Sequence, residues 1–342
     1  MRAPSTVLMP MTLALLAALR RRRFPGAAAA LAAWALAAAL PAAAGPACPP
    51  TAQSQMGPAA MKEAQRRPQD RGYLWRLDKD GRVSWLYGTL HLGRAAWTVP
   101  GPHLAAALRQ ADTLALELDP LDAEAMKPLL APGDPARRAQ VLTAERARRL
   151  QRQWQAVCAA EEGRLLAALP PVLQVTALSG HAARADGLHP EFAIDAVLAG
   201  YARRARLPLV ALESARDQRA LFVPETAAEE AEQVDDALAE LENGRLRRRM
   251  GELAQMWAGG DLARLASYPQ WCECMQTPAE RALMHQLLEA RNPALARGIA
   301  ALHDGGLRVF AAVGALHMVG AEGLVALLQR RGFAVTQVLP PP

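Results

Sequence analysis

The stretch Val83–Leu92, VSWLYGTLHL, carries the pattern that decides the fold. It is apolar and rich in strand-forming residues, and the apolar run Tyr73–Leu77 lies just before it. The four residues between the two runs, DKDG at 78–81, end in Asp-Gly, which is typical of a β-hairpin turn. We therefore expect two paired strands, the second of which runs into the motif GTLH at residues 88–91.

Outward from this hairpin, predicted strands alternate with predicted helices. Further strands are expected at Thr113–Asp119, Leu209–Glu213, Leu307–Val313 and Phe333–Leu339. Helical spacing of apolar residues predicts helices at Pro102–Ala111, Phe192–Arg206 and Ala321–Arg331, and across most of 121–180 and 225–300. The order predicts an α/β fold: a mixed central sheet with flanking helices and a large helical insertion at about residues 121–300.

The composition indicates a globular protein. The chain has 342 residues, of which 21% are charged and 51% hydrophobic, which excludes a disordered chain and a membrane protein with many spans. The net charge is +6, but residues 1–48 hold five arginines and no acidic residue, so the rest of the chain carries only +1. This balance gives no support for a nucleic-acid-binding face, and no nucleic acid is expected as a partner.

The N-terminus reads as a targeting segment. Arginines occupy positions 20–23, an Ala/Leu-rich run covers 27–44, and small residues follow it, as in a cleavable signal peptide. We expect residues 1–47 to be this segment, 48–70 to be a polar linker and 71–342 to be the folded domain. The predicted location is periplasmic or secreted. The alternative is an uncleaved membrane anchor, which would be the chain's contact with a membrane.

Four cysteines bear on the compartment, at positions 48, 158, 272 and 274. The pair in Cys272-Glu273-Cys274 looks too close for an easy internal disulfide. We therefore expect Cys158 to bond to Cys272 or Cys274, with three buried thiols as the alternative.

A second copy of the glycine–histidine spacing follows the strand predicted at 307–313, as GALH at 314–317. Glycine permits a positive φ or a close backbone approach, and open α/β sheets build their sites at the ends of such strands. Neutral imidazole serves as a base or as a metal ligand, although a lone strand-end histidine is more often structural. Glu117 lies on the strand face opposite the leucines of 113–119, where a buried carboxylate needs a cation or strong donors nearby. A salt bridge to an arginine is the simpler role for Glu117.

These motifs, in this order, resemble the TraB/GumN family. The resemblance rests on residues 85–93, 114–119, 208–214, 291–292 and 310–317, and it spans roughly residues 73–340. It implies a fold similar to erythromycin-esterase (EreA) and ChaN-like proteins and a relation to the Tiki membrane proteases, which are thought to depend on metal. It also implies a site made by His91, Glu117, Arg291 and His317, with Glu213 nearby.

The first functional hypothesis is an exported metal-dependent peptidase or other hydrolase, acting on a peptide or a small molecule. His91 and His317 would hold a divalent ion (zinc, manganese or cobalt), and Glu117 would be the third ligand or the general base. Arg291 would stabilise an oxyanion or bind a substrate carboxylate. Three alternatives stay open: a metal-free esterase with His91 as general base, a periplasmic protein that binds haem or another ligand, and a family member that only binds partners.

Overall fold

A computed structural model describes residues 48–340, so the expected targeting segment at 1–47 lies outside the described residues. Its centre is a six-stranded sheet with the strand order β4-β3-β5-β2-β1-β6. The strands are β1 (Tyr73–Lys79), β2 (Arg82–Thr89), β3 (Thr113–Leu116), β4 (Leu209–Ala211), β5 (Val309–Gly314) and β6 (Ala334–Leu339). The mixed sheet and its flanking helices confirm the predicted α/β fold. The finer likeness to EreA and ChaN-like proteins stays a prediction.

The strand directions determine where the chain can build a site. Strands β4, β3, β5 and β2 run parallel to one another. Strand β1 is antiparallel to β2 through the predicted hairpin, and β6 is antiparallel to β1. Because the four parallel strands point the same way, their C-terminal ends lie along one edge of the sheet.

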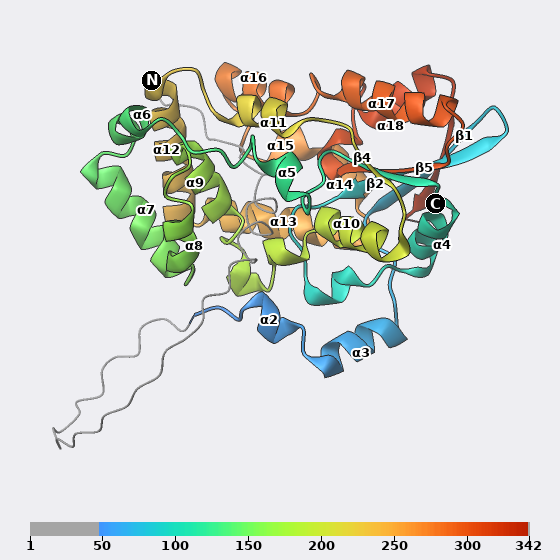
Figure 1. Cartoon of the computed structure of the whole chain (residues 1–342), viewed down its shortest axis with the longest axis horizontal. Coiled ribbons are helices and arrows are strands. Elements are labelled where there is room, and N and C mark those ends of the chain that lie inside the picture. Colours follow the sequence, from blue (N-terminus) through green and yellow to red (C-terminus); the bar gives the residue numbers. More distant parts are fainter. Residues whose placement is uncertain (1–47, 341–342) are drawn as a thin grey trace.

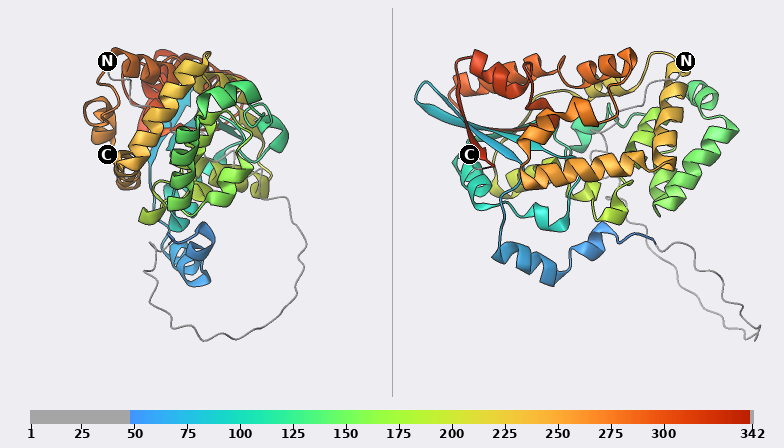
Figure 2. Two further views of the ribbon diagram at one scale, coloured as in Figure 1. Left: turned by 90° about the vertical axis from the view of Figure 1, so that its left-hand side faces the viewer. Right: turned by 180° about the vertical axis from the view of Figure 1, so that it is seen from behind.

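Helices cover both faces of this sheet (Figures 1 and 2). Helices α17 and α18 lie on one face, and α4 and α10 on the other (Figure 1). The α-helices of the described chain are α2 (Ala52–Gln55), α3 (Pro58–Arg66), α4 (Pro102–Gln110), α5 (Ala123–Met126), α6 (Pro135–Val141), α7 (Ala144–Ala156), α8 (Ala160–Leu165), α9 (Pro171–Ser179), α10 (Ile194–Ala205), α11 (Ala215–Phe222), α12 (Ala227–Glu242), α13 (Arg245–Gly259), α14 (Leu262–Ala266), α15 (Tyr268–Trp271), α16 (Pro278–Leu287), α17 (Asn292–Asp304) and α18 (Leu324–Arg330). Short 3-10 helices are η1 (Ala95–Thr98), η2 (Arg184–Asp186), η3 (Pro190–Phe192) and η4 (Ala315–His317). Within residues 48–340, no helix has both the length and the apolar character needed to cross a bilayer.

Two hydrophobic cores hold the molecule together. The first lies around the sheet, where Leu86, Leu114 and Phe310 are fully buried. The second lies among the helices inserted between β3 and β5, with Trp154 and Val234 in its interior. The helices α6 to α9 and α12 gather on the side of the molecule away from the β1–β2 hairpin (Figure 1). The insertion is not purely helical, because it also contributes β4 to the edge of the sheet.

Residues 48–70 are not a structureless linker, contrary to the sequence prediction. They contain α2 and α3, and Ala52 packs in a small cluster with Ala95 and Phe192. Gln55 also makes a hydrogen bond of 2.8 Å between its Nε2 and His189 Nε2. The helices of this segment are short, four residues in α2 and nine in α3, and the sequence prediction missed them. The segment becomes ordered because it docks on the domain.

The predicted disulfide pairing is wrong. Cys48 is bonded to Cys158, and Cys272 is bonded to Cys274. The close pair can bond because Glu273 between the two cysteines has a φ of 52°, and this turn brings their Cα atoms to 5.1 Å. Cys158 then joins the N-terminal segment to the end of α7, and not to the C-terminal half as expected.

Candidate functional site

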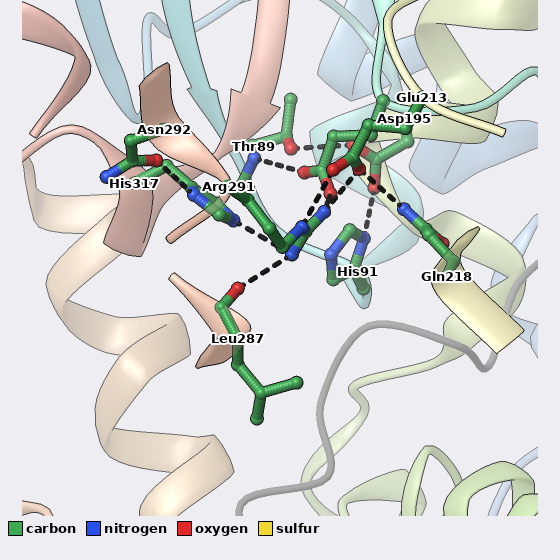
Figure 3. Close-up of polar contacts among 11 residues, drawn as sticks. Thr89, His91, Asp195, Glu213, Gln218, Leu287, Arg291, Asn292 and His317 are labelled. Carbon is green, nitrogen blue, oxygen red and sulfur yellow. Dashed lines mark hydrogen bonds and ion pairs between the residues drawn. The ribbon is translucent and has the colours of Figure 1, made fainter. Parts of the chain in front are cut away.

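Each of the four parallel strands is followed at its C-terminal end by a residue that can carry chemistry (Figure 3). His91 follows β2, Glu117 follows β3, Glu213 follows β4, and His317 lies in η4 directly after β5. Residues far apart in the sequence meet here because parallel strands deliver their ends to the same edge.

Three of the side chains expected from the sequence converge beside Gly314. A Cβ atom placed on this glycine would lie 3.4 Å from Glu117 Oε1, 3.5 Å from His317 Cδ2 and 3.7 Å from His91 Nε2. The φ of Gly314 is −48°, so the glycine is not needed for a left-handed turn. A methyl group here would be in ordinary van der Waals contact with all three groups, whereas a longer side chain would enter the space among them.

Arg291, which lies just before α17, makes contacts with several residues of the site. Its Nε donates to Glu213 Oε1 at 2.8 Å, and its Nη2 donates to Glu117 Oε2 and to Glu213 Oε2. Its Nη1 donates to the Leu287 carbonyl oxygen at 2.8 Å and faces His317 Nε2 at 3.2 Å. A guanidinium has five N–H groups, and these contacts use all five. In this arrangement Arg291 has no N–H left to bind an oxyanion or a substrate carboxylate, as the sequence reading expected, and it holds the other residues in position.

His317 is held as a neutral imidazole. It is buried, its Nδ1 donates to Asn292 Oδ1 at 2.6 Å, and its Nε2 is then the acceptor for Arg291. Asn292 is itself fixed, because its Nδ2 donates to the carbonyl oxygen of Glu322. Burial lowers the pKa of His317 to about 3. His317 therefore stays uncharged beside the guanidinium at neutral pH.

His91 has a different electrostatic environment, because a carboxylate holds it. Its Nδ1 donates to Asp195 Oδ2 at 2.7 Å, and the other oxygen of Asp195 accepts a hydrogen bond of 2.6 Å from the Thr89 hydroxyl. Burial by itself would lower the pKa of His91, but the charge and hydrogen bond of Asp195 outweigh it and raise the pKa to about 9. With Nδ1 bonded to Asp195, His91 also lines a cavity.

Glu117 is an ionised carboxylate with both oxygens engaged. Oε1 accepts the backbone N–H of Gly314 at 2.8 Å, and Oε2 accepts from Arg291 at 2.5 Å. Burial opposes the charge, but the attraction of Arg291 lowers the pKa of Glu117 to about 2. The simpler role proposed from the sequence, a salt bridge to an arginine, is thus present in the structure.

A cavity opens above this polar edge, with walls that are almost entirely apolar. Its polar lining includes His91, Glu117, Arg291 and His317. The apolar walls come mainly from the helices α13, α14 and α16 and the turn after α16, through Leu253, Trp257, Leu265, Met284, Leu287 and Leu288. The cavity therefore has its titratable groups on one side and a hydrophobic enclosure around the rest.

Sequence reasoning missed the roles of three residues in this site. Asp195 lies in the first turn of α10, where an acidic residue is already explained by the helix dipole, so nothing distinguished it. Thr89 is inside the GTLH motif and Asn292 follows Arg291, but their side chains gave no sign of which partner they would find. Only the approach of α10 to β2 and of α17 to η4 creates these contacts.

The divalent ion expected at His91, Glu117 and His317 does not fit this arrangement of donors. Both ring nitrogens of His317 and both oxygens of Glu117 already have partners, and the fixed cation of Arg291 lies among them. Within residues 48–340, no group of three histidine, cysteine or acidic side chains has the geometry to hold a metal ion. Metal binding stays a prediction, which elemental analysis of the purified protein can test.

Comparison with known proteins gives one match, which is to a protein family. The model of the TraB/PrgY/gumN family matches residues 73–337. Neither a curated protein nor a solved structure matches the chain. The matched span begins with β1 and ends within β6, so it includes five complete strands, most of β6 and every residue of the candidate site. The chain therefore belongs to the TraB/PrgY/gumN family.

Proposed function

We propose that the protein is a hydrolase of acyl bonds, either esters or amides, in which the His91–Asp195 pair transfers the proton. The observation that carries this proposal is the bond of 2.7 Å between His91 Nδ1 and Asp195 Oδ2, in a histidine that lines the cavity. A carboxylate in this position orients the imidazole and stabilises the imidazolium that forms when it accepts a proton. This is the arrangement that general base catalysis requires.

The reaction follows from these positions. The reacting form of His91 is the neutral imidazole, which predominates above its pKa of about 9. Its Nε2 takes a proton from a water molecule in the cavity while the water oxygen attacks the carbonyl carbon, and the carbonyl π electrons move to the carbonyl oxygen. When the tetrahedral intermediate collapses, the bond to the leaving oxygen or nitrogen breaks. The leaving group then takes the proton from His91, so the products are an acid and an alcohol or amine. Glu117, whose two oxygens are held by Arg291 and the Gly314 N–H, contributes its negative charge beside His91.

The haem-binding alternative has less support. The cavity has a volume of about 70 Å³, whereas a cavity of about 150 Å³ is needed for benzene, which is much smaller than haem. His317 is also engaged on both ring nitrogens, which leaves no axial position on it. A Soret band in the purified protein would instead favour haem binding over hydrolysis.

The test is hydrolysis of a panel of 4-nitrophenyl esters and of peptides by the full oxidised protein. We expect His91→Ala to lower kcat by about 10²–10⁴. The matched control is His103→Ala, because His103 makes the same kind of bond, 2.8 Å from Nδ1 to Asp70 Oδ2, at an exposed position outside the cavity. His103→Ala should keep wild-type activity.

Three outcomes separate the hypotheses. Activity that survives His91→Ala contradicts the proposal. Activity that chelation removes, and that zinc, manganese or cobalt restores, would favour the metal-dependent peptidase. An inactive protein on every ester and peptide would favour a role in binding alone.

We also propose that the protein acts in the periplasm or after secretion. The predicted targeting segment supports this, and so do two disulfides in the described chain, since such bonds persist mainly in oxidising compartments. The substrate would then be a peptide or a small molecule outside the cytoplasm.

A further inference from the structure

The walls of the cavity beside His91 are fixed in place. Trp257 donates from its Nε1 to the Gly88 carbonyl oxygen at 2.7 Å, so the indole is tied to the strand that leads to His91. Leu287 is tied through its carbonyl oxygen to Arg291. Both anchors belong to buried residues, so the enclosure keeps its shape relative to the titratable groups.

The walls of the cavity are apolar and buried, and its volume is small. Leu253, Leu265 and Met284 are each 3% exposed or less. The cavity volume of about 70 Å³ is roughly half of the ~150 Å³ that accepts a six-carbon ring. A cavity of this size suits a short aliphatic chain of about three or four carbons. Away from the polar edge formed by His91, Glu117, Arg291 and His317, the walls offer no partner to a charged or hydroxylated group.

We propose that this cavity is the acyl-binding pocket of the enzyme and that it selects substrates with a short aliphatic acyl group of about butanoyl size. The inference rests on the proposed function, because it takes His91 as the group next to the scissile carbonyl. The small volume disfavours long acyl chains and aromatic rings, and the apolar walls disfavour a charged acyl group because its desolvation is costly.

Chain-length selectivity tests the proposal. We measure kcat/KM for 4-nitrophenyl acetate, butanoate, hexanoate and octanoate, and expect butanoate to exceed octanoate by at least about tenfold, the size of effect that a hydrophobic pocket gives for mismatched chains. Met284→Ala removes an unbranched side chain from the wall and should move the optimum to hexanoate or octanoate. Met284→Leu keeps the volume and should keep the wild-type order. Leu165→Ala, at an exposed leucine on α8, should change nothing.

The outcomes distinguish the pocket assignment from the proposed hydrolase function. If His91→Ala abolishes hydrolysis but rates do not depend on chain length, or if Met284→Ala leaves the order unchanged, the pocket assignment fails and the proposed function stands. If hydrolysis survives His91→Ala, the proposed function fails.

If no ester is hydrolysed, ligand-observed NMR with methyl butanoate and methyl octanoate decides the pocket assignment by itself. Binding of butanoate that is lost in Leu265→Trp supports the pocket. Equal binding of both esters, or no binding, overturns it.

Discussion

At the residue scale, the site depends on one buried guanidinium. Arg291 is 8% exposed and faces two carboxylates, of which Glu117 is 7% exposed. Charges at such positions are tolerated only while each keeps its partners, and removing one partner leaves the others buried and uncompensated. The same contact network that positions Glu117 and His317 should therefore also stabilise the fold.

Arg291→Met is expected to lower the free energy of unfolding by about 3–5 kcal/mol, because Glu117 and Glu213 lose their shared cation. Arg291→Lys should recover only part of this loss, since an ammonium cannot form the forked contacts. Denaturant unfolding at pH 7 measures both. Arg164→Met is the control, as its pairing with Glu161 is on the surface and is worth less than about 1 kcal/mol. An equal loss in the free energy of unfolding at the two positions would contradict a stabilising role for the buried contacts of Arg291.

The pH dependence of activity should follow His91. The base form of His91 is needed for proton transfer, so wild-type kcat/KM should rise with pH up to about 9, where its pKa lies. Asp195→Asn removes the carboxylate that raises this pKa, so the rise should move to lower pH while the maximum falls. The free energy of unfolding should change with pH in the opposite direction. The His91–Asp195 pair stabilises the fold fully below about pH 6.5, and this stabilisation is lost as the pH rises through about 9. A profile that is the same in Asp195→Asn would exclude His91 as the base.

At the element scale, α12 carries an aspartate that opposes folding. Burial and the nearby Glu232 and Glu240 raise the pKa of Asp236 from 3.8 to about 7. The folded protein therefore binds more protons than the unfolded chain between these values, and this aspartate costs stability as the pH rises through that window.

Asp236→Asn should raise the free energy of unfolding at pH 8 by about 1–2 kcal/mol, after allowance for the partial exposure of the side chain. At pH 4 the gain should nearly vanish. The neighbouring Asp235→Asn is the control, because Asp235 pairs with Arg146 and Arg149 and its loss should destabilise at pH 8. Unfolding curves at the two pH values measure the difference, and a gain that is independent of pH would show that the charge of Asp236 is not its cause.

The two disulfides should differ in their effect because they close chain segments of different length. Cys48–Cys158 spans 110 residues, whereas Cys272–Cys274 spans 2. In the chain-entropy model, loss of the long bond costs about 5 kcal/mol and loss of the short one only about 1 kcal/mol. Unfolding of Cys48→Ser/Cys158→Ser and of Cys272→Ser/Cys274→Ser without reductant compares them. A larger loss in the second variant would overturn this order.

At the scale of the whole molecule, the predicted cleavage of the targeting segment would determine which chain folds. The docked segment that begins at Cys48 follows directly after the predicted targeting residues, so cleavage near residue 47 would leave the first disulfide intact. Protein recovered from the periplasm should have an intact mass well below the 36.7 kDa of the full chain. Recovery at the full mass would instead favour the membrane anchor.

Much of the sheet could be predicted because its signals are local. The Asp-Gly turn and the apolar run of Val83–Leu92 determine the β1–β2 hairpin whatever surrounds it. The predicted end of β3 was wrong: the strand stops at Leu116, although the alternation of apolar residues continues to Asp119. The strand ends level with β4, its neighbour of only three residues, whereas its other neighbour β5 continues to Gly314.

The sequence by itself determined which residues stand at strand ends, because a strand followed by Gly-x-x-His is a local pattern in both copies. Tertiary structure alone decided their partners: Asp195 reaches His91 because α10 begins beside β2, and Arg291 meets Glu117 and Glu213 because α17 begins at the edge where β3 and β4 end. The disulfide pairs were decided in the same way, by docking of residues 48–67 and by the backbone turn at Glu273. Local patterns follow from backbone and side-chain preferences over a few residues, whereas these partners depend on how distant segments pack, which no short window of sequence contains.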